Sequence, residues 1–220
     1  MPASRALHWF GEAMRLWKRA PATFAAIAFV VILASLLLEP VPVAGFVAAN
    51  VVAPLLACGL LFASLAADRG ERARVRLLVA AFAVPLPAQV AIVLSGFVAL
   101  AFEAFAAWQV AEVNLLLPLK DATSMPNSAI LLVYAAGVLA SLPVTFVPMA
   151  ALFDGEGIRN AFALSLSAFA RNVPALLLLA AYSYALLMLG LATMGVGLVL
   201  ALPWIAAASY AAWKDVFAVA

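Results

Sequence analysis

The side chains on which metal sites and many hydrolytic enzymes depend are scarce in this sequence. It has one cysteine, Cys58, and one histidine, His8, among 220 residues. A single cysteine cannot form a disulfide within the chain, and a histidine zinc site or a serine–histidine site needs imidazole elsewhere. No G-x-x-x-x-G-K-[ST], G-x-G-x-x-G or G-x-S-x-G motif occurs. We therefore expect a protein that is not an enzyme and carries no cofactor or metal.

Charged residues are also few. They make up 10% of the chain, hydrophobic residues make up 69%, and the mean hydropathy is +1.18. A chain of this composition cannot cover a water-facing surface of ordinary polarity, so it indicates an integral membrane protein. The net charge of +2 is small and the basic residues are dispersed, which does not indicate a nucleic-acid partner.

Long apolar runs, separated by proline-rich or charged segments, predict transmembrane helices. The expected fold is an all-α bundle of six spans, at about residues 22–38, 46–67, 88–111, 129–153, 174–191 and 195–213. The run 77–111 is too long for one straight span and contains Pro85 and Pro87. Span three therefore begins near either Leu77 or Ala88.

Three amphipathic segments accompany the spans. Residues 5–20 place His8, Glu12, Arg15, Lys18 and Arg19 on one side of a helical wheel. The apolar residues on the other side are Ala6, Leu7, Phe10, Ala13, Met14, Trp17 and Ala20. Two tryptophans on or beside the apolar face favour a helix that lies on a membrane surface. We expect similar interfacial helices at 71–84 and 157–172.

The sequence pattern predicts three hairpin-like units, although abundant alanine, leucine and proline can imitate a repeat. Each return span ends near an aspartate, Asp68, Asp154 or Asp215. A carboxylate at a helix C-terminus opposes the helix dipole, so each aspartate needs a basic partner. We expect these partners on the surface helices, with Arg19, Arg72 and Arg171 as examples. The alternative is one metal or headgroup-amine site formed by the three aspartates together.

The basic residues predict the orientation. Eleven of the twelve Lys and Arg residues fall on one side of the six-span arrangement, and only Lys120 falls on the other. Connections rich in Lys and Arg stay in the cytoplasm. Both termini are therefore expected in the cytoplasm.

Short motifs near the two ends carry a family resemblance. They are F-G-E-A-M-R-L-W-K-R-A-P at 10–21, R-N-V-P at 171–174 and Y-A-A-W-K-D-V-F at 210–217. On these motifs the sequence resembles a family of uncharacterised bacterial six-span inner-membrane proteins. It is more distantly similar to the membrane domain attached to some bacterial glycerophosphodiester phosphodiesterases. The resemblance implies the six-span fold and an inner-membrane location. It does not imply hydrolysis, because the catalytic domain of those phosphodiesterases has no counterpart here.

Two sets of residues are candidates for a functional role. Contacts with lipid headgroups are expected from basic and tryptophan residues of the surface helices: Arg15, Trp17, Lys18, Arg19, Arg72 and Arg171. Polar groups inside the spans, which either line a cavity or serve the packing and boundaries of the bundle, are Glu103, Tyr182, Tyr184 and Trp204.

These observations favour a lipid-engaging scaffold or an accessory subunit of a membrane assembly. Its partners would be membrane lipids, mainly anionic, together with another protein or a second copy of the chain. A transporter or channel for a small solute or lipid is the alternative, and it needs polar groups near the midplane. The least favoured hypothesis is an intramembrane lipid enzyme, which would need the three aspartates to converge on a metal.

Overall fold

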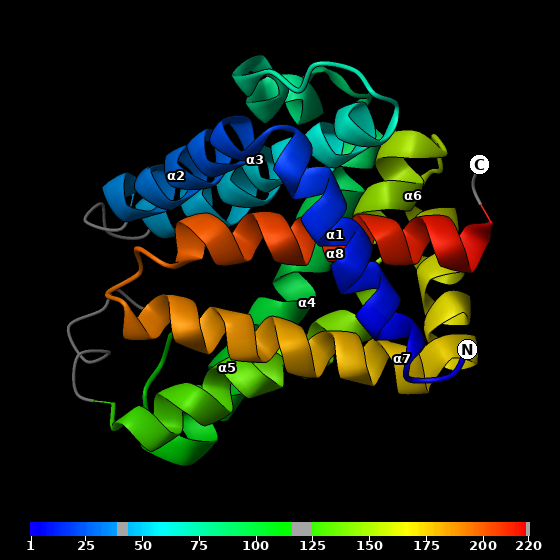
Figure 1. The fold of residues 1–220 in the computed structure, drawn as a ribbon. Coiled ribbons are helices and arrows are strands. Elements are labelled where there is room, and N and C mark those ends of the chain that lie inside the picture. The colour runs from blue at the N-terminus through cyan, green and yellow to red at the C-terminus, as the bar shows by residue number, and fades with distance from the viewer. Residues whose placement is uncertain (39–43, 116–124, 219–220) are drawn as a thin grey trace.

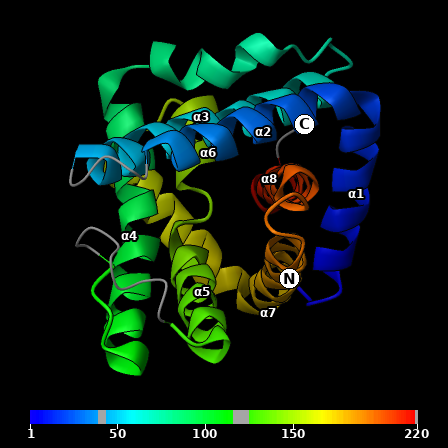
Figure 2. The same cartoon turned by 90° about the vertical axis from the view of Figure 1, so that its left-hand side faces the viewer.

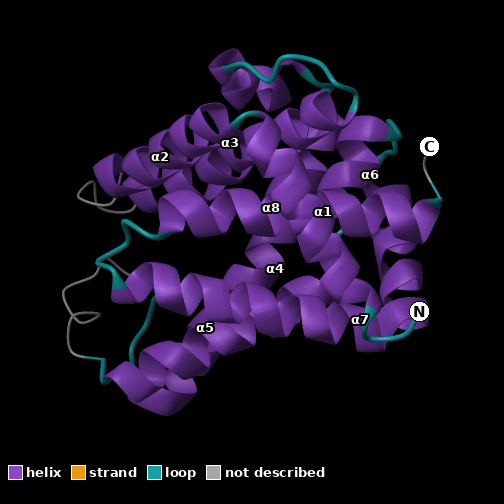
Figure 3. Cartoon of the chain, viewed as in Figure 1, coloured by secondary structure: helices purple, strands orange, loops and turns teal. Residues whose placement is uncertain are grey.

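The computed structural model describes residues 1–38, 44–115 and 125–218. Within these ranges the regular secondary structure is entirely helical, which confirms the all-α prediction (Figure 3). Lys120, the basic residue expected on the opposite side, lies outside the described residues, as does most of the predicted turn after span one.

Figure 1 shows the order of the helices along the chain. In chain order they are α1 (Arg5–Arg19), α2 (Pro21–Leu38), α3 (Ala44–Asp68), η1 (Val75–Ala83), α4 (Leu86–Ala111), α5 (Asn127–Ser141), η3 (Leu142–Val144), α6 (Val147–Phe153), α7 (Ile158–Ala192) and α8 (Leu198–Phe217).

Five of the described helical segments are long and apolar enough to cross a membrane. They are α2, α3 from Gly45, α4, α5 together with η3, and α7. This composition indicates a membrane protein. The predicted sixth span corresponds to α8, which is not among the five, so the six-span arrangement stays a prediction.

Helix α8 lies at the centre of the fold. It packs against α1, α2, α3 and α7, and Figure 2 shows it nearly end-on among these helices. Ala207, Ala208 and Ala212 in its second half are fully buried, and small residues allow close helix packing. Tyr210 and Trp213 are also buried, each at 2% exposure. These two aromatic side chains of α8 therefore face protein.

Helix α1 crosses over α8 (Figure 1). Its buried residues recur at helical spacing and are Ala6, Trp9, Ala13 and Leu16. The buried face is rotated from the expected one, because Leu7, expected on the apolar side, is 53% exposed whereas Trp9 is fully buried. The first surface segment is thus a helix held against the bundle through its tryptophan side.

The segment predicted as an interfacial helix at 71–84 has a different form. Residues Val75–Ala83 form the 3-10 helix η1, which packs against α3. A side chain at Gly59 would place its Cβ only 2.7 Å from the Cα of Leu78, so the glycine lets the two backbones meet. Since α4 begins at Leu86, span three starts near Ala88 and not near Leu77.

Prolines mark two further boundaries. The predicted span 129–153 is instead divided into α5, η3 and α6, with Pro143 and Pro148 at the breaks. The Ser165 hydroxyl donates to the Pro143 carbonyl and accepts the Phe146 N–H, which satisfies backbone groups at the break. The predicted helices 157–172 and 174–191 correspond to the two parts of α7, which meet at a kink where Asn172 is non-helical (φ −129°, ψ 21°), just before Pro174.

Candidate functional site

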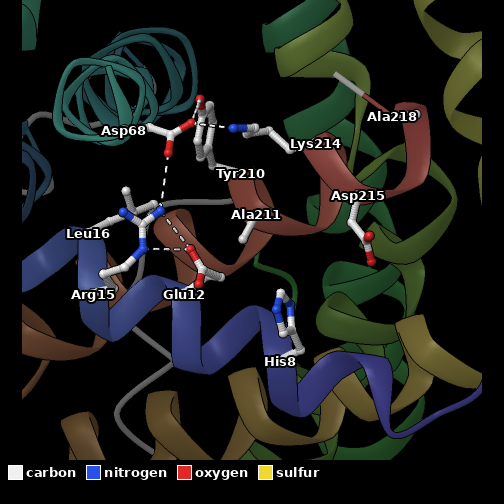
Figure 4. Close-up of a pocket in the computed structure, with 10 residues that line it drawn as sticks. All are labelled: His8, Glu12, Arg15, Leu16, Asp68, Tyr210, Ala211, Lys214, Asp215 and Ala218. Atoms are coloured by element: carbon white, nitrogen blue, oxygen red, sulfur yellow. Dashed lines mark hydrogen bonds and ion pairs between the residues drawn. The ribbon is translucent and has the colours of Figure 1, made fainter. Parts of the chain in front are cut away.

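Asp68 at the end of α3 connects three helices. Its Oδ1 accepts a hydrogen bond from Arg15 Nη2 of α1 at 3.2 Å. Its Oδ2 accepts from the Tyr210 hydroxyl at 3.1 Å and from Lys214 Nζ at 2.5 Å, both on α8 (Figure 4). Two cations and one hydroxyl therefore surround this carboxylate, and they tie α1 and α8 to α3.

Asp215 near the end of α8 forms a second junction with α1. Its two oxygens accept hydrogen bonds from Arg5 Nε and Nη2, both at 2.5 Å, and Oδ2 also accepts from Trp9 Nε1 at 2.8 Å. The hydrogen bond from Arg5 lowers the pKa of Asp215 below its usual value; Trp9 acts in the same direction, and partial burial opposes them. The fork of Arg5 suits this bidentate contact.

Arg19 supports the same arrangement through backbone carbonyls. Its Nη1 donates to the backbone carbonyls of Ala67 and Asp68 at the C-terminus of α3. A cation there satisfies carbonyls that have no partner within the helix and complements the helix dipole. The basic residues Arg5, Arg15 and Arg19 of α1 thus hold it against α3 and α8.

Asp154, which follows α6, has different surroundings. It is exposed and makes no ion pair with any described residue. Partial burial raises the pKa of Asp154, and nearby Glu156 adds to this effect, whereas the indole N–H of Trp213 acts in the opposite direction. The expectation of a basic partner from a surface helix is thus met by Arg15 for Asp68 and Arg5 for Asp215, and by no described residue for Asp154.

The three aspartates do not come together. Within the described ranges, no group of three or more His, Cys, Asp or Glu side chains is placed to hold a metal ion. The alternative of one metal site formed by Asp68, Asp154 and Asp215 therefore lacks the required geometry.

A first pocket, which we call the α1 pocket, lies between α1 and the end of α8 and has a volume of about 430 Å³. Figure 4 shows its polar lining, which consists of His8, Glu12, Arg15, Asp68, Tyr210, Lys214 and Asp215. Arg15 also donates to Glu12 at 2.7 Å. Most of the charged groups in this lining are already joined in ion pairs, so the pocket has few unpaired charges that could bind a ligand.

A second pocket, which we call the Asp154 pocket, shares Asp68 and Tyr210 with the first and has a volume of about 320 Å³. It lies where α3, α6 and α8 meet. Its lining consists of Phe62, Leu65, Asp68, Arg69, Leu152, Phe153, Asp154, Tyr210 and Trp213. Four aromatic rings and both signs of charge therefore border one space.

A third space, the hydroxyl cavity, lies among α4, α5, α7 and α8 and has a volume of about 330 Å³. Its polar lining comes from five hydroxyl side chains: Ser95, Ser141, Thr145, Ser183 and Ser209. None of the predicted cavity residues lines it. The four-residue spacing of Ser141 and Thr145 in the sequence was the one available indication of this cavity. It is a weak indication, because hydroxyls in apolar helices commonly bond their own backbone, as both residues do here.

The predicted cavity residues lie elsewhere. The carboxylate of Glu103 on α4 packs against Gly137 on α5, where a Cβ would clash with it. Tyr184 donates to the Leu131 carbonyl at 3.0 Å, and its ring borders a smaller apolar pocket of about 170 Å³. Tyr182 stacks at an angle on Phe10, with ring centroids 5.4 Å apart, and Trp204 meets Trp17 edge-on at 6.5 Å. All four residues thus contact a neighbouring helix.

The predicted headgroup residues divide into two sets. Arg15 and Arg19 bind other parts of the fold. Trp17 packs on Trp204, and its buried Nε1 has no hydrogen-bond partner among the residues that the structure describes. The other set consists of Lys18, Arg72 and Arg171, which are exposed and form no ion pair in the described part of the chain.

The chain matches no model of a protein family, no curated protein and no solved structure. The family resemblance drawn from the short terminal motifs therefore stays a prediction. The function is argued below from the geometry and charge of these sites.

Proposed function

We propose that this chain is a non-enzymatic, integral protein of a bacterial inner membrane that engages anionic lipids, as a scaffold or as an accessory subunit of a membrane assembly. In this proposal α8 is the sixth span, and both termini face the cytoplasm. A protein partner or a second copy of the chain is compatible with either role.

The observation that carries the proposal is the division among the basic residues. Those of α1 that bind acids or carbonyls hold the fold together, whereas Lys18, Arg72 and Arg171 are exposed without ion pairs in the described ranges. Exposed basic residues beside a span attract anionic headgroups by about 1 kcal/mol each. We therefore assign the headgroup contacts to these three residues and give Arg15 and Arg19 a structural role.

The test uses the full chain in nanodiscs of mixed phosphatidylglycerol and phosphatidylcholine, with bound lipid counted by native mass spectrometry. The wild type should enrich the anionic lipid. The triple variant Lys18→Ala, Arg72→Ala, Arg171→Ala should lose most of this preference. A contribution of about 1 kcal/mol from each residue corresponds to a decrease in the enrichment of the anionic lipid of about fivefold for each residue removed.

The matched control keeps the charges and changes the side chains: Lys18→Arg, Arg72→Lys, Arg171→Lys. It should retain the preference because an anionic surface attracts either cation. An equal lipid ratio for the wild type and the alanine variant would contradict the proposal.

The hydroxyl cavity favours a second candidate function, the passage of a small neutral polar solute. Its polar lining is hydroxyl groups, which suit an uncharged hydrogen-bonding solute better than an ion. Glycerol flux into proteoliposomes should then exceed that of empty liposomes and fall when Ser183→Leu and Ser209→Leu fill the cavity. A further loss of flux in Glu103→Ala would extend the path to the contact between Glu103 and Gly137, whereas equal flux with and without protein would remove this candidate.

A further inference from the structure

The Asp154 pocket holds one unmatched charge of each sign. Asp68 in its wall is neutralised by Arg15 and Lys214. Asp154 and Arg69 also line the pocket, and neither forms an ion pair in the described part of the chain. A ligand that carries both a cation and an anion would complement this pair.

Trp213 adds a hydrogen-bond donor that has no acceptor among the described residues. The residue is 2% exposed, and its Nε1 is buried without a hydrogen-bond partner in that part of the chain. The indole N–H acts on the pKa of Asp154 but does not reach a hydrogen bond of normal geometry with it. Since a buried donor left unsatisfied is unfavourable, an oxygen acceptor on a ligand would stabilise this site.

The rest of the lining suits a cation close to Asp154. Phe153 lies 5.3 Å from Trp213 and 6.1 Å from Tyr210 between ring centroids, and Phe62 packs edge-on against it at 5.6 Å. Ring faces attract ammonium groups. The C-termini of α3 and α6 also border the pocket, and their dipoles favour positive charge.

We propose that the Asp154 pocket binds the headgroup of an aminophospholipid of the phosphatidylethanolamine type. The primary ammonium donates to Asp154, and phosphate oxygens accept from Arg69 and from the indole N–H of Trp213. The volume of about 320 Å³ suits a headgroup without its acyl chains. The assignment to a lipid rests on the proposed function, because it places these ends of α3 and α8 at the cytoplasmic membrane boundary.

The experiment uses the full chain in nanodiscs with equal parts phosphatidylethanolamine, phosphatidylcholine and phosphatidylglycerol, with bound lipids counted by native mass spectrometry. Phosphatidylethanolamine should be enriched over phosphatidylcholine, because a trimethylated ammonium cannot donate to Asp154. Asp154→Asn should reduce this enrichment roughly tenfold, since a charge-assisted hydrogen bond is lost. Arg69→Gln and Trp213→Phe, which each remove a donor to phosphate, should reduce it several-fold.

Two matched controls lie close by and outside the pocket lining. Glu71→Gln removes an exposed acid and Arg74→Gln removes an exposed cation, and neither residue lines the pocket. Both should leave the preference for ethanolamine over choline unchanged. Trp213 is a core residue and its variant can unfold, so Asp154→Asn, at an exposed position, is the deciding substitution.

Equal binding of the ethanolamine and choline lipids by the wild type would overturn the inference, as would an unchanged preference in Asp154→Asn. Displacement of the lipid by equimolar soluble phosphoethanolamine would overturn the assignment to a membrane lipid. The phosphatidylglycerol arm separates the two proposals. Retained anionic-lipid enrichment without ethanolamine selectivity removes this inference alone, whereas loss of both also removes the proposed function.

Discussion

The three aspartates at the ends of the predicted return spans occupy matching positions in the sequence pattern, but their surroundings differ. Asp68 and Asp215 are paired with basic residues, whereas Asp154 has no ion pair in the described ranges. Basic residues of α1 reach Asp68 and Asp215. The predicted surface segments 71–84 and 157–172 supply no ion pair to Asp154 among the described residues. A position at the end of a helix therefore does not decide what an aspartate does. The helix that crosses over it decides whether the acid is structural or available to a ligand.

The strongest test of this contrast is Asp68→Ala. The substitution leaves Lys214 and Tyr210 without their shared acceptor in a partly buried setting. We expect the free energy of unfolding to fall by about 2 to 3 kcal/mol, measured by denaturant titration in detergent micelles. Asp68→Glu, which keeps the charge, should recover part of the loss. A cost for Asp68→Ala as small as that of Asp154→Ala would remove the contrast.

The next largest effect is expected at the second junction of α1. Trp9→Phe keeps an aromatic ring in the core but removes the N–H that binds Asp215. The loss of a hydrogen bond to a charged group should cost about 1.5 kcal/mol in the same titration and increase hydrogen exchange in α1. Leu7→Ala, on the exposed face of α1, is the control and should change little. Equal effects of the two substitutions would show that Trp9 contributes only packing.

The two classes of aspartate should also respond to pH with opposite signs. The pKa of Asp215 is lowered in the folded chain, so its contribution to stability is present above the ordinary aspartate pKa of about 3.9 and is lost as pH falls through its folded pKa. The pKa of Asp154 is raised, so stability is lost as pH rises from about 3.9 through its folded pKa.

Melting temperatures measured against pH for the wild type, Asp215→Asn and Asp154→Asn check this directly. Asp215→Asn should flatten the acid side of the profile, and Asp154→Asn should flatten the rise in stability on acidification towards the ordinary pKa. The same sign for both difference profiles would contradict the assignment.

The smallest expected effect is on stability in Asp154→Asn near neutral pH. The acid has no ion pair in the described ranges, and its charged form is disfavoured in the fold. The free energy of unfolding should stay within about 0.5 kcal/mol of the wild type or rise slightly. A loss above 1 kcal/mol, on the scale of a typical destabilising mutation, would place Asp154 with the structural aspartates.

Sequence periodicity anticipated part of this site. It singled out the three aspartates and predicted a helix that carries basic residues at the start of the chain. It did not identify the partners, because Arg5 and Asp215 are 210 residues apart and Trp9 and Asp215 are 206 apart. A helical wheel gives the faces of a helix but neither its crossing point nor its rotation, so Trp9 was not assigned to the buried face. The hydroxyl cavity was missed for a similar reason, since its serines come from four different helices.

Hydropathy by itself determined that the chain is helical and belongs in a membrane, because lipid offers backbone groups no partner and apolar helices satisfy those groups internally. Composition also determined which residues are too costly to leave without partners. Only the tertiary structure decided which of them meet. Because α1 crosses over α8, the side chains of Arg5, Arg15 and Arg19 bind other residues of the fold. Asp154 and Arg69, in contrast, border a pocket and form no ion pair in the described ranges. The physical reason is that electrostatic and hydrogen-bonding interactions depend on distances of a few ångströms, which are set by packing between segments far apart in the chain.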